Sequence, residues 1–204
     1  MPPTSAAPTG RHLTELHAAE PYPTPSPATV LSVNRDDEHR FSKPQREEIV
    51  LLEGLGIEGD SHLGKLVQHQ ARMRTHPMQS NLRQVHLIHS ELFEELAEAG
   101  YAIEPGGMGE NITTRGIDLL KLSRGTRLHL GDEAVIEITG LRDPCELLNG
   151  LAPHLMKQVL LREPDGTIVR KAGIMSIVVR GGTVKPGDGI RIEAPAEHVP
   201  LTTV

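Results

Sequence analysis

One stretch of this chain can be laid out as a β-hairpin from its residue pattern alone, and it limits the folds that the rest can join. Apolar and polar side chains alternate in Thr126–Leu130, the apolar Ala134, Ile136 and Ile138 share one face of Ala134–Thr139, and Gly131-Asp132 lies between the two runs. A period of two places every second side chain on one face, which is typical of a half-buried strand. The pattern therefore predicts an antiparallel strand pair packed on a core.

Other segments extend this β-rich pattern. Short apolar runs predict strands at residues 29–33, 49–52, 84–89, 173–179 and 190–192. Helices are fewer: one is predicted over Ser90–Ala99 with Ser90 as its N-cap, and one from about Ala152 to Arg162, ended by Pro164. Strands outnumber helices and do not alternate with them, which disfavours a parallel α/β sheet. We predict a mainly β fold, a mostly antiparallel barrel or sandwich with two or three peripheral helices.

The first 27 residues differ from the rest, because they hold seven of the 16 prolines. Proline has no backbone donor and fixes φ, so residues 21–27 are not expected inside a sheet or a helix. No apolar stretch typical of a secretory signal follows the start. We predict a flexible extension over residues 1–27 and a single domain over residues 28–204.

Composition excludes several classes of protein. The single cysteine rules out a disulfide framework, a four-cysteine zinc site and an internal iron–sulfur cluster. A net charge of −6 and only two Phe, two Tyr and no Trp argue against a nucleic-acid-binding domain. No stretch has the 18 or so uncharged apolar residues of a membrane span. We expect a cytoplasmic protein that binds neither a nucleic acid polymer nor a membrane.

The cysteine has a distinctive position. Cys145 follows Leu141-Arg142-Asp143-Pro144, directly after the predicted strand 134–139. A lone cysteine is commonly a small buried hydrophobe. An arginine three residues away would, however, lower the thiol pKa and favour the thiolate, which is the form that attacks substrates or binds metals. Packing and chemistry therefore both remain open for Cys145.

Two further segments are less specific. Residues 105–111 hold three glycines within four positions, which lets a backbone approach a ligand closely, but they match neither phosphate-loop template. His62, His69 and His76 are seven residues apart, roughly 10 Å on a helix, which is too far to share one metal ion. A histidine-only zinc site is not expected.

Five motifs in order along the chain give a family resemblance. They are Gly56-Ile57-Glu58-Gly59-Asp60, Arg83-Gln84-Val85-His86-Leu87, Gly109-Glu110-Asn111-Ile112-Thr113, Gly116-Ile117-Asp118 and Arg142-Asp143-Pro144-Cys145. This series resembles the MOSC domain, named for the C-terminal domain of molybdenum cofactor sulfurases, in its small stand-alone bacterial form. The resemblance spans about residues 29–193 and implies a strand-rich β-barrel.

The resemblance also implies roles for individual residues. Cys145 corresponds to the molybdenum ligand, and Arg142 and Asp143 belong to the short loop that presents it. The remaining positions that correspond to the site of the molybdopterin cofactor are Asp60, Arg83, Gly109, Glu110 and Asn111. A soft thiolate suits a sulfur-rich molybdenum centre. Asp143, Glu110 or a nearby histidine are the candidates to deliver a proton.

Similar enzymes reduce N-hydroxylated compounds, including hydroxylamino-purines, amidoximes and hydroxylamines. The resemblance therefore implies an oxidoreductase that releases an amine and consumes two electrons and two protons. Because one cysteine cannot hold an iron–sulfur cluster and no dinucleotide fingerprint is present, we expect an external reductase as the electron donor.

Three alternatives remain at this point. The chain could be a sulfur carrier that holds a persulfide on Cys145 for the assembly of metal–sulfur cofactors, since an electropositive loop suits that role equally well. It could also bind molybdenum cofactor without turnover, or use Cys145 only for packing. A homodimer is the commonest assembly for small domains.

Overall fold

The computed structural model describes residues 27–68 and 70–204, so the predicted extension, Pro27 apart, lies outside the described residues. The strands are β1 (Thr29–Asn34), β2 (Gln45–Arg46), β3 (Ile49–Leu52), β4 (Gly56–Ile57), β5 (Val85–His89), β6 (Ile112–Arg115), β7 (Arg127–Leu130), β8 (Ala134–Leu141), β9 (Leu160–Arg162), β10 (Ile168–Arg170), β11 (Ile174–Arg180), β12 (Gly182–Val184) and β13 (Ile190–Glu193). The helices are α1 (Gln70–Thr75), α2 (Glu91–Glu98) and α3 (Leu155–Val159), with 3₁₀ turns η1 (Leu119–Lys121) and η2 (Glu146–Gly150). The mainly β prediction with few helices is confirmed.

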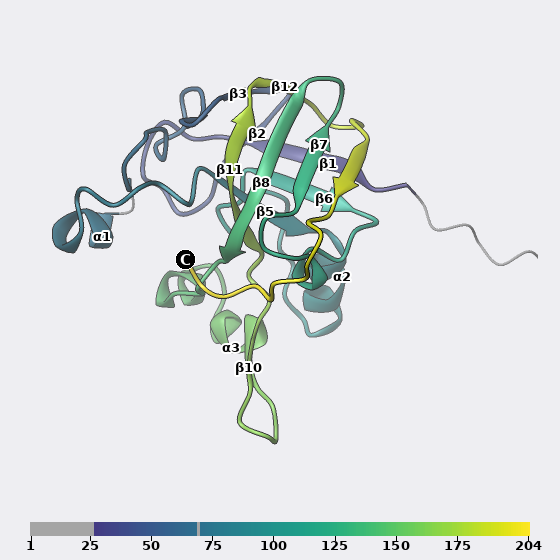
Figure 1. Ribbon diagram of the computed structural model, residues 1–204. Helices are drawn as coiled ribbons and strands as arrows, with labels where there is room; N and C mark the ends of the chain where they lie inside the picture. The colour runs from purple at the N-terminus through teal and green to yellow at the C-terminus, as the bar shows by residue number, and fades with distance from the viewer. Residues whose placement is uncertain (1–26, 69) are drawn as a thin grey trace, which may run out of the picture.

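One large sheet organises the molecule (Figure 1). Its strand order is β13-β7-β8-β11-β5-β6-β1-β2, so β11 lies in the middle and joins β7–β8 on one side to β5–β6–β1 on the other. β5 and β6 are parallel and are connected through α2, whereas the other pairs among the described strands are antiparallel.

The prediction of a barrel is wrong, because the large sheet is open. β1 lies beside the residues that precede β13: Thr29 and Gly189 form a bridge there, the Val30 N–H donates to the Asp188 carbonyl, and the Gly187 N–H donates to the Val30 carbonyl. Smaller sheets of β12-β3-β4 and β10-β9 complete the strand structure. These contacts bring the two ends of the sheet close together, but β13 pairs with neither β1 nor β2 as a strand, so the sheet is not a closed barrel.

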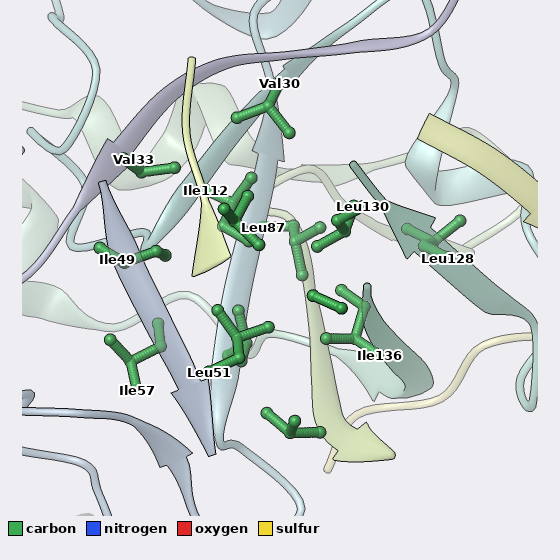
Figure 2. Packing of buried hydrophobic residues seen from close by; sticks show 14 of the residues in the cluster. Val30, Val33, Ile49, Leu51, Ile57, Leu87, Ile112, Leu128, Leu130 and Ile136 are labelled. Atoms are coloured by element: carbon green, nitrogen blue, oxygen red, sulfur yellow. The ribbon is translucent and has the colours of Figure 1, made fainter. Parts of the chain in front are cut away.

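The two faces of the sheet bury different clusters. Leu87 on β5 belongs to the larger cluster, in which side chains of β1, β3, β6, β7 and β8 meet (Figure 2). The next residue, Ile88, packs on the opposite face with Phe93 of α2, Leu155 of α3 and Met108. This reversal from Leu87 to Ile88 follows from the period of two along a strand. His86, two residues before Ile88, is therefore on the α2 and α3 side of the sheet.

The second predicted helix is largely wrong. Only Leu155–Val159 is helical, and Leu160–Arg162 instead forms β9, which pairs with β10 in a hairpin that projects beyond α3 (Figure 1). Pairing with β10 satisfies the backbone of β9 and replaces the helical hydrogen bonds. Ser90 is the N-cap of α2, as predicted, but its side chain makes no capping bond. No helix in the described part of the chain is long and apolar enough to cross a membrane.

Candidate functional site

A cavity of about 400 Å³ lies on the α2 and α3 side of the sheet, which is a volume within the usual range for small-molecule sites. Its lining includes His86 on β5 and Met175 on β11, which are paired directly across the two strands. Met108 and Phe41 provide further apolar surface. Of the predicted site residues, the cavity brings together six: Arg83, Gly109, Asn111, Arg142, Asp143 and Cys145.

The loop that carries Cys145 is anchored at the end of β8. The backbone N–H of Arg142 donates to the carbonyl of Gly173 at 3.0 Å, which fixes the start of the loop beside β11. At the other end, the carbonyl of Cys145 accepts the N–H of Leu148 as η2 begins. Cys145 is partly buried and has a free thiol. The loop therefore holds the thiol in the cavity between two fixed backbone anchors.

Arg142 places a cation in the same cavity. Its Nη1 atom is buried and has no hydrogen-bond partner among the described residues. The guanidinium lies over the ring of Phe41, 5.7 Å from its centroid. Burial lowers the pKa of Arg142, and the negative charges of Cys145, Glu110 and Asp143 oppose this effect. An unpartnered guanidinium nitrogen is costly to bury, and an anionic ligand would supply its missing acceptor.

The charge of the cavity differs from that of the whole chain. Arg40, Lys43, Arg74, Arg83 and Arg142 all line it, although the chain has a net charge of −6. Asp143 is the one carboxylate residue that lines it within the described part of the chain. Such an excess of cations in a concave site attracts anions.

Asp143 lies at the exposed edge of this site. Its Oδ1 accepts a hydrogen bond from Arg170 Nε at 3.0 Å. Arg170 is the last residue of β10, so the projecting hairpin is tied to the loop that carries Cys145.

The glycine-rich loop approaches the cavity through its backbone. Gly109 has φ +82°, and a Cβ atom there would lie 2.5 Å from the carbonyl oxygen of Phe41. Only glycine fits such a position without strain. Glu110 is fully buried beneath the cavity, where it accepts hydrogen bonds from the Gly106 N–H and the Thr113 hydroxyl. Burial raises the pKa of Glu110, and the two hydrogen bonds oppose this effect.

Asn111 links this loop to a buried ion pair. Its side-chain oxygen accepts the N–H of His86 at 3.1 Å, and its Nδ2 donates to Asp60 Oδ2 at 3.0 Å. The same Asp60 oxygen lies 2.6 Å from Lys43 Nζ, and both side chains are almost completely buried. Burial alone would raise the pKa of Asp60, but a hydrogen bond from His62 and the charge of Lys43 hold it well below its usual range. Asp60 thus supports the cavity from behind, without lining it.

The lysine of this pair and several other lining residues were not singled out in the sequence. Lys43 stands alone in a polar stretch, and its partner Asp60 is 17 residues away. Met175 enters the site from β11, and Phe41 from the segment between β1 and β2, whose backbone lies against Gly109. No local pattern marks any of these three residues. Arg83, which was predicted, lines the cavity with its backbone N–H bonded to Asn81 Oδ1 at 3.0 Å.

The burial of His86 leads to a prediction about the stability of the fold at low pH. Burial holds its pKa well below 6.5, and the charge of Arg142 adds to this effect. The folded protein therefore keeps its full stability from neutral His86 above pH 6.5, which is about the pKa of His86 in the unfolded chain, and it loses this stability as the pH falls below that value. One such group contributes a slope of up to about 1.4 kcal/mol per pH unit. His89, whose pKa burial also lowers, acts in the same direction.

Urea unfolding of the wild type and of His86→Gln between about pH 7 and pH 5 checks this expectation. The free energy of unfolding of His86→Gln should fall less steeply with decreasing pH than that of the wild type, by up to about 1.4 kcal/mol per pH unit. His76→Gln changes an exposed histidine outside the cavity and should keep the wild-type slope. Equal slopes in all three proteins would show that His86 takes up its proton in the folded state.

The described residues contain no group of three or more His, Cys, Asp or Glu side chains that could hold a metal ion. A metal in this cavity would therefore need ligands beyond those of the protein, with Cys145 as the soft donor that the cavity offers.

Comparisons with known proteins agree with this description. A family model for the MOSC domain matches residues 63–191. The crystal structure of the YuaD protein from Bacillus subtilis superposes with a TM-score of 0.68 at 26% identity, covering 82% of this chain and 96% of that one. YiiM from Geobacillus stearothermophilus shares the fold with a TM-score of 0.62 at 18% identity, covering 86% and 80%. YiiM from Escherichia coli does so with a TM-score of 0.54 at 20% identity, covering 84% and 72%. No curated protein sequence matches the chain.

Proposed function

Because the chain belongs to the MOSC domain family, we propose that it binds a molybdenum cofactor in the cavity around Cys145 and reduces N-hydroxylated compounds there. The observation that carries this proposal is the pairing of a thiol with an unpartnered, buried guanidinium nitrogen in one cavity. A molybdopterin cofactor is complementary to both, since it brings a soft metal together with an anionic phosphate.

Five of the predicted residues that line the cavity then have a part in holding the cofactor. Cys145 would ligate the metal, and Arg142 and Arg83 would accompany the anionic end of the cofactor. The backbone at Gly109 permits a close approach. Asn111 would orient the ligand, because Asp60 and the His86 backbone fix its side chain. When bound, the cofactor would supply two-electron redox chemistry at a sulfur-ligated metal.

The residues of the chain then orient the substrate and manage protons. The net reaction is R–NHOH + 2 e⁻ + 2 H⁺ → R–NH₂ + H₂O, in which the N–O bond breaks. The chain has one cysteine and no dinucleotide fingerprint, so the electrons would come from an external reductase. Met108, Phe41 and Met175 would form the apolar wall against which the substrate packs.

The test uses protein produced in a host that makes the cofactor. Molybdenum per chain is measured by elemental mass spectrometry, and turnover of a hydroxylamino-purine, an amidoxime and a hydroxylamine is measured with a reduced viologen dye as the electron source. Near-stoichiometric metal with turnover supports the proposal. Metal without turnover of any of the three compounds would leave a cofactor-binding module. Absence of metal, together with a persulfide on Cys145 after exposure to a cysteine desulfurase, would favour the sulfur carrier.

A further inference from the structure

We propose that His62, held by Asp60, is the catalytic residue that delivers a proton to the oxygen leaving the substrate. This inference rests on the proposed reduction of N-hydroxylated compounds and adds to it the identity of the acid. His62 lines the same cavity as Cys145, although it lies 83 positions earlier in the sequence. The two residues therefore share one space into which a substrate could bind.

The carboxylate of Asp60 holds the imidazole in place. One oxygen, Oδ1, accepts the backbone N–H of His62 at 3.0 Å and lies 3.3 Å from the ring nitrogen Nδ1. The other oxygen, Oδ2, is taken by Lys43 Nζ at 2.6 Å and by Asn111 Nδ2 at 3.0 Å. The His62 carbonyl also accepts a hydrogen bond from Asn81 Nδ2 at 3.0 Å, so the backbone is fixed on both sides of the ring.

This arrangement determines which ring nitrogen carries the proton in the neutral imidazole. Asp60 is an acceptor only, so Nδ1–H donates to it, and the Ser61 hydroxyl at 3.2 Å can share that proton. The second nitrogen, Nε2, is then left to bind and release the proton used in the reaction. A carboxylate on the far side of a histidine orients the ring, as in hydrolytic triads.

The other candidate acids are less suitable in this structure. Glu110 is fully buried and does not line the cavity; its Oε1 atom is bonded to Gly106 and Thr113, and its Oε2 atom has no partner among the described residues. Asp143 is exposed and bonded to Arg170. His86 directs its Nε2 at the carbonyl of Ala172, at 2.8 Å, and its lowered pKa keeps it neutral. His62, by contrast, is partly exposed at the cavity.

The charged and titratable groups around His62 come from three segments. Asp60 precedes it on the same turn, and Lys43 reaches Asp60 from behind. The ring of His39 stands 5.5 Å away, centroid to centroid, beside Arg40 and its partner Asp36. In the balanced reaction, two electrons from the reductase and two protons break the N–O bond, and His62 supplies the proton that converts the leaving oxygen to water. Solvent then returns a proton to Nε2.

Two measurements test this assignment. In the metal-free protein, long-range ¹H–¹⁵N NMR should find His62 as the Nδ1–H tautomer at a pH where it is neutral, with its signals identified by their loss in His62→Ala. In the loaded protein, His62→Ala should lower kcat by about 10²-fold or more at unchanged molybdenum content. Added imidazole should restore part of the rate in this variant alone. His76→Gln, an exposed histidine outside the cavity, is the matched control and should keep the wild-type rate.

The outcomes separate this inference from the proposed function. Wild-type turnover with a His62→Ala rate within about twofold of it would overturn the role of His62 and leave the proposed function intact. An Nε2–H tautomer in the metal-free protein would likewise overturn the role assigned to Asp60. Loss of molybdenum from His62→Ala would make it a cofactor-binding residue. A loaded wild type that reduces none of the compounds would overturn both proposals, whatever the tautomer.

Discussion

Replacing Cys145 by serine is expected to leave the chain folded and strip it of molybdenum and of reductase activity. A hard hydroxyl oxygen is a poor substitute for a thiolate at a soft, sulfur-rich metal. The loss of metal affinity should exceed the roughly 10–100-fold that removal of an outer-shell partner costs. Elemental mass spectrometry and turnover with reduced viologen measure the two effects. Thermal unfolding of the metal-free variant should match the metal-free wild type, because the loop is anchored by the backbone of Arg142 and Cys145.

Cys145→Ala and Met78→Ser complete this comparison. The alanine variant should behave as the serine variant does, since both lack the thiol. Met78 is 80% exposed and does not line the cavity, so its loss removes a sulfur atom without touching the site. Met78→Ser should keep the metal. Wild-type levels of molybdenum in Cys145→Ser would mean that the cofactor is held without the thiolate, and the assignment of Cys145 as a ligand would be wrong.

Lys43→Met is expected to be the most destabilising change at the site, at about 3–5 kcal/mol at pH 7. The variant leaves the Asp60 carboxylate buried without its cation, because both side chains of the pair are almost completely buried. The urea midpoint should fall by more than about 1 M. As the pH falls toward the ordinary Asp pKa of about 3.9, the unpaired carboxyl takes up a proton and the difference from wild type should shrink.

The double variant Lys43→Met with Asp60→Asn provides the control. Removing both charges deletes the unpaired carboxylate, so the double variant should be more stable than Lys43→Met alone, with a coupling of about 1–3 kcal/mol. Asparagine keeps an oxygen that can accept the His62 N–H. A Lys43→Met variant that loses less than about 1 kcal/mol would show that water or a relaxed backbone replaces the lysine.

Much of the strand structure could be read from short-range patterns. Ile49–Leu52 is a strand over its predicted length, and the hairpin around Gly131-Asp132 forms as β7 and β8. Both depend on alternation or on a continuous apolar run, which are properties of neighbouring residues. The segment Leu160–Arg162 could not be read in this way, because its strand exists only through pairing with Ile168–Arg170. A local pattern of leucines fits a helix equally well.

The site residues likewise divide into those that a local motif marks and those that it does not. Cys145, Arg142 and Gly109 belong to motifs with an unusual residue order, and all three line the cavity. Lys43 has no such neighbourhood, and its importance comes from one contact with Asp60 in a buried environment. His62 was visible only as a histidine of wide spacing; it bonds to Asp60 two positions away, and Asp60 is itself held by Lys43 and Asn111, which are 17 and 51 positions away. Contacts over long sequence distances, which one sequence does not encode locally, separate these two groups.

The central place of β11 has a consequence for the growing chain on the ribosome. β11 ends at Arg180, and it alone joins β8 to β5 in the large sheet. Until these residues have been synthesised, the β7–β8 hairpin and the β5–β6–β1 half each present an unpaired edge strand with an uncovered apolar face. Such edges are sites of wrong pairing between nascent chains. The cavity also completes late, since Met175 on β11 closes one of its walls. Slower translation ahead of residue 174 would prolong this vulnerable stage, and chaperones that cover strand edges would matter most during it.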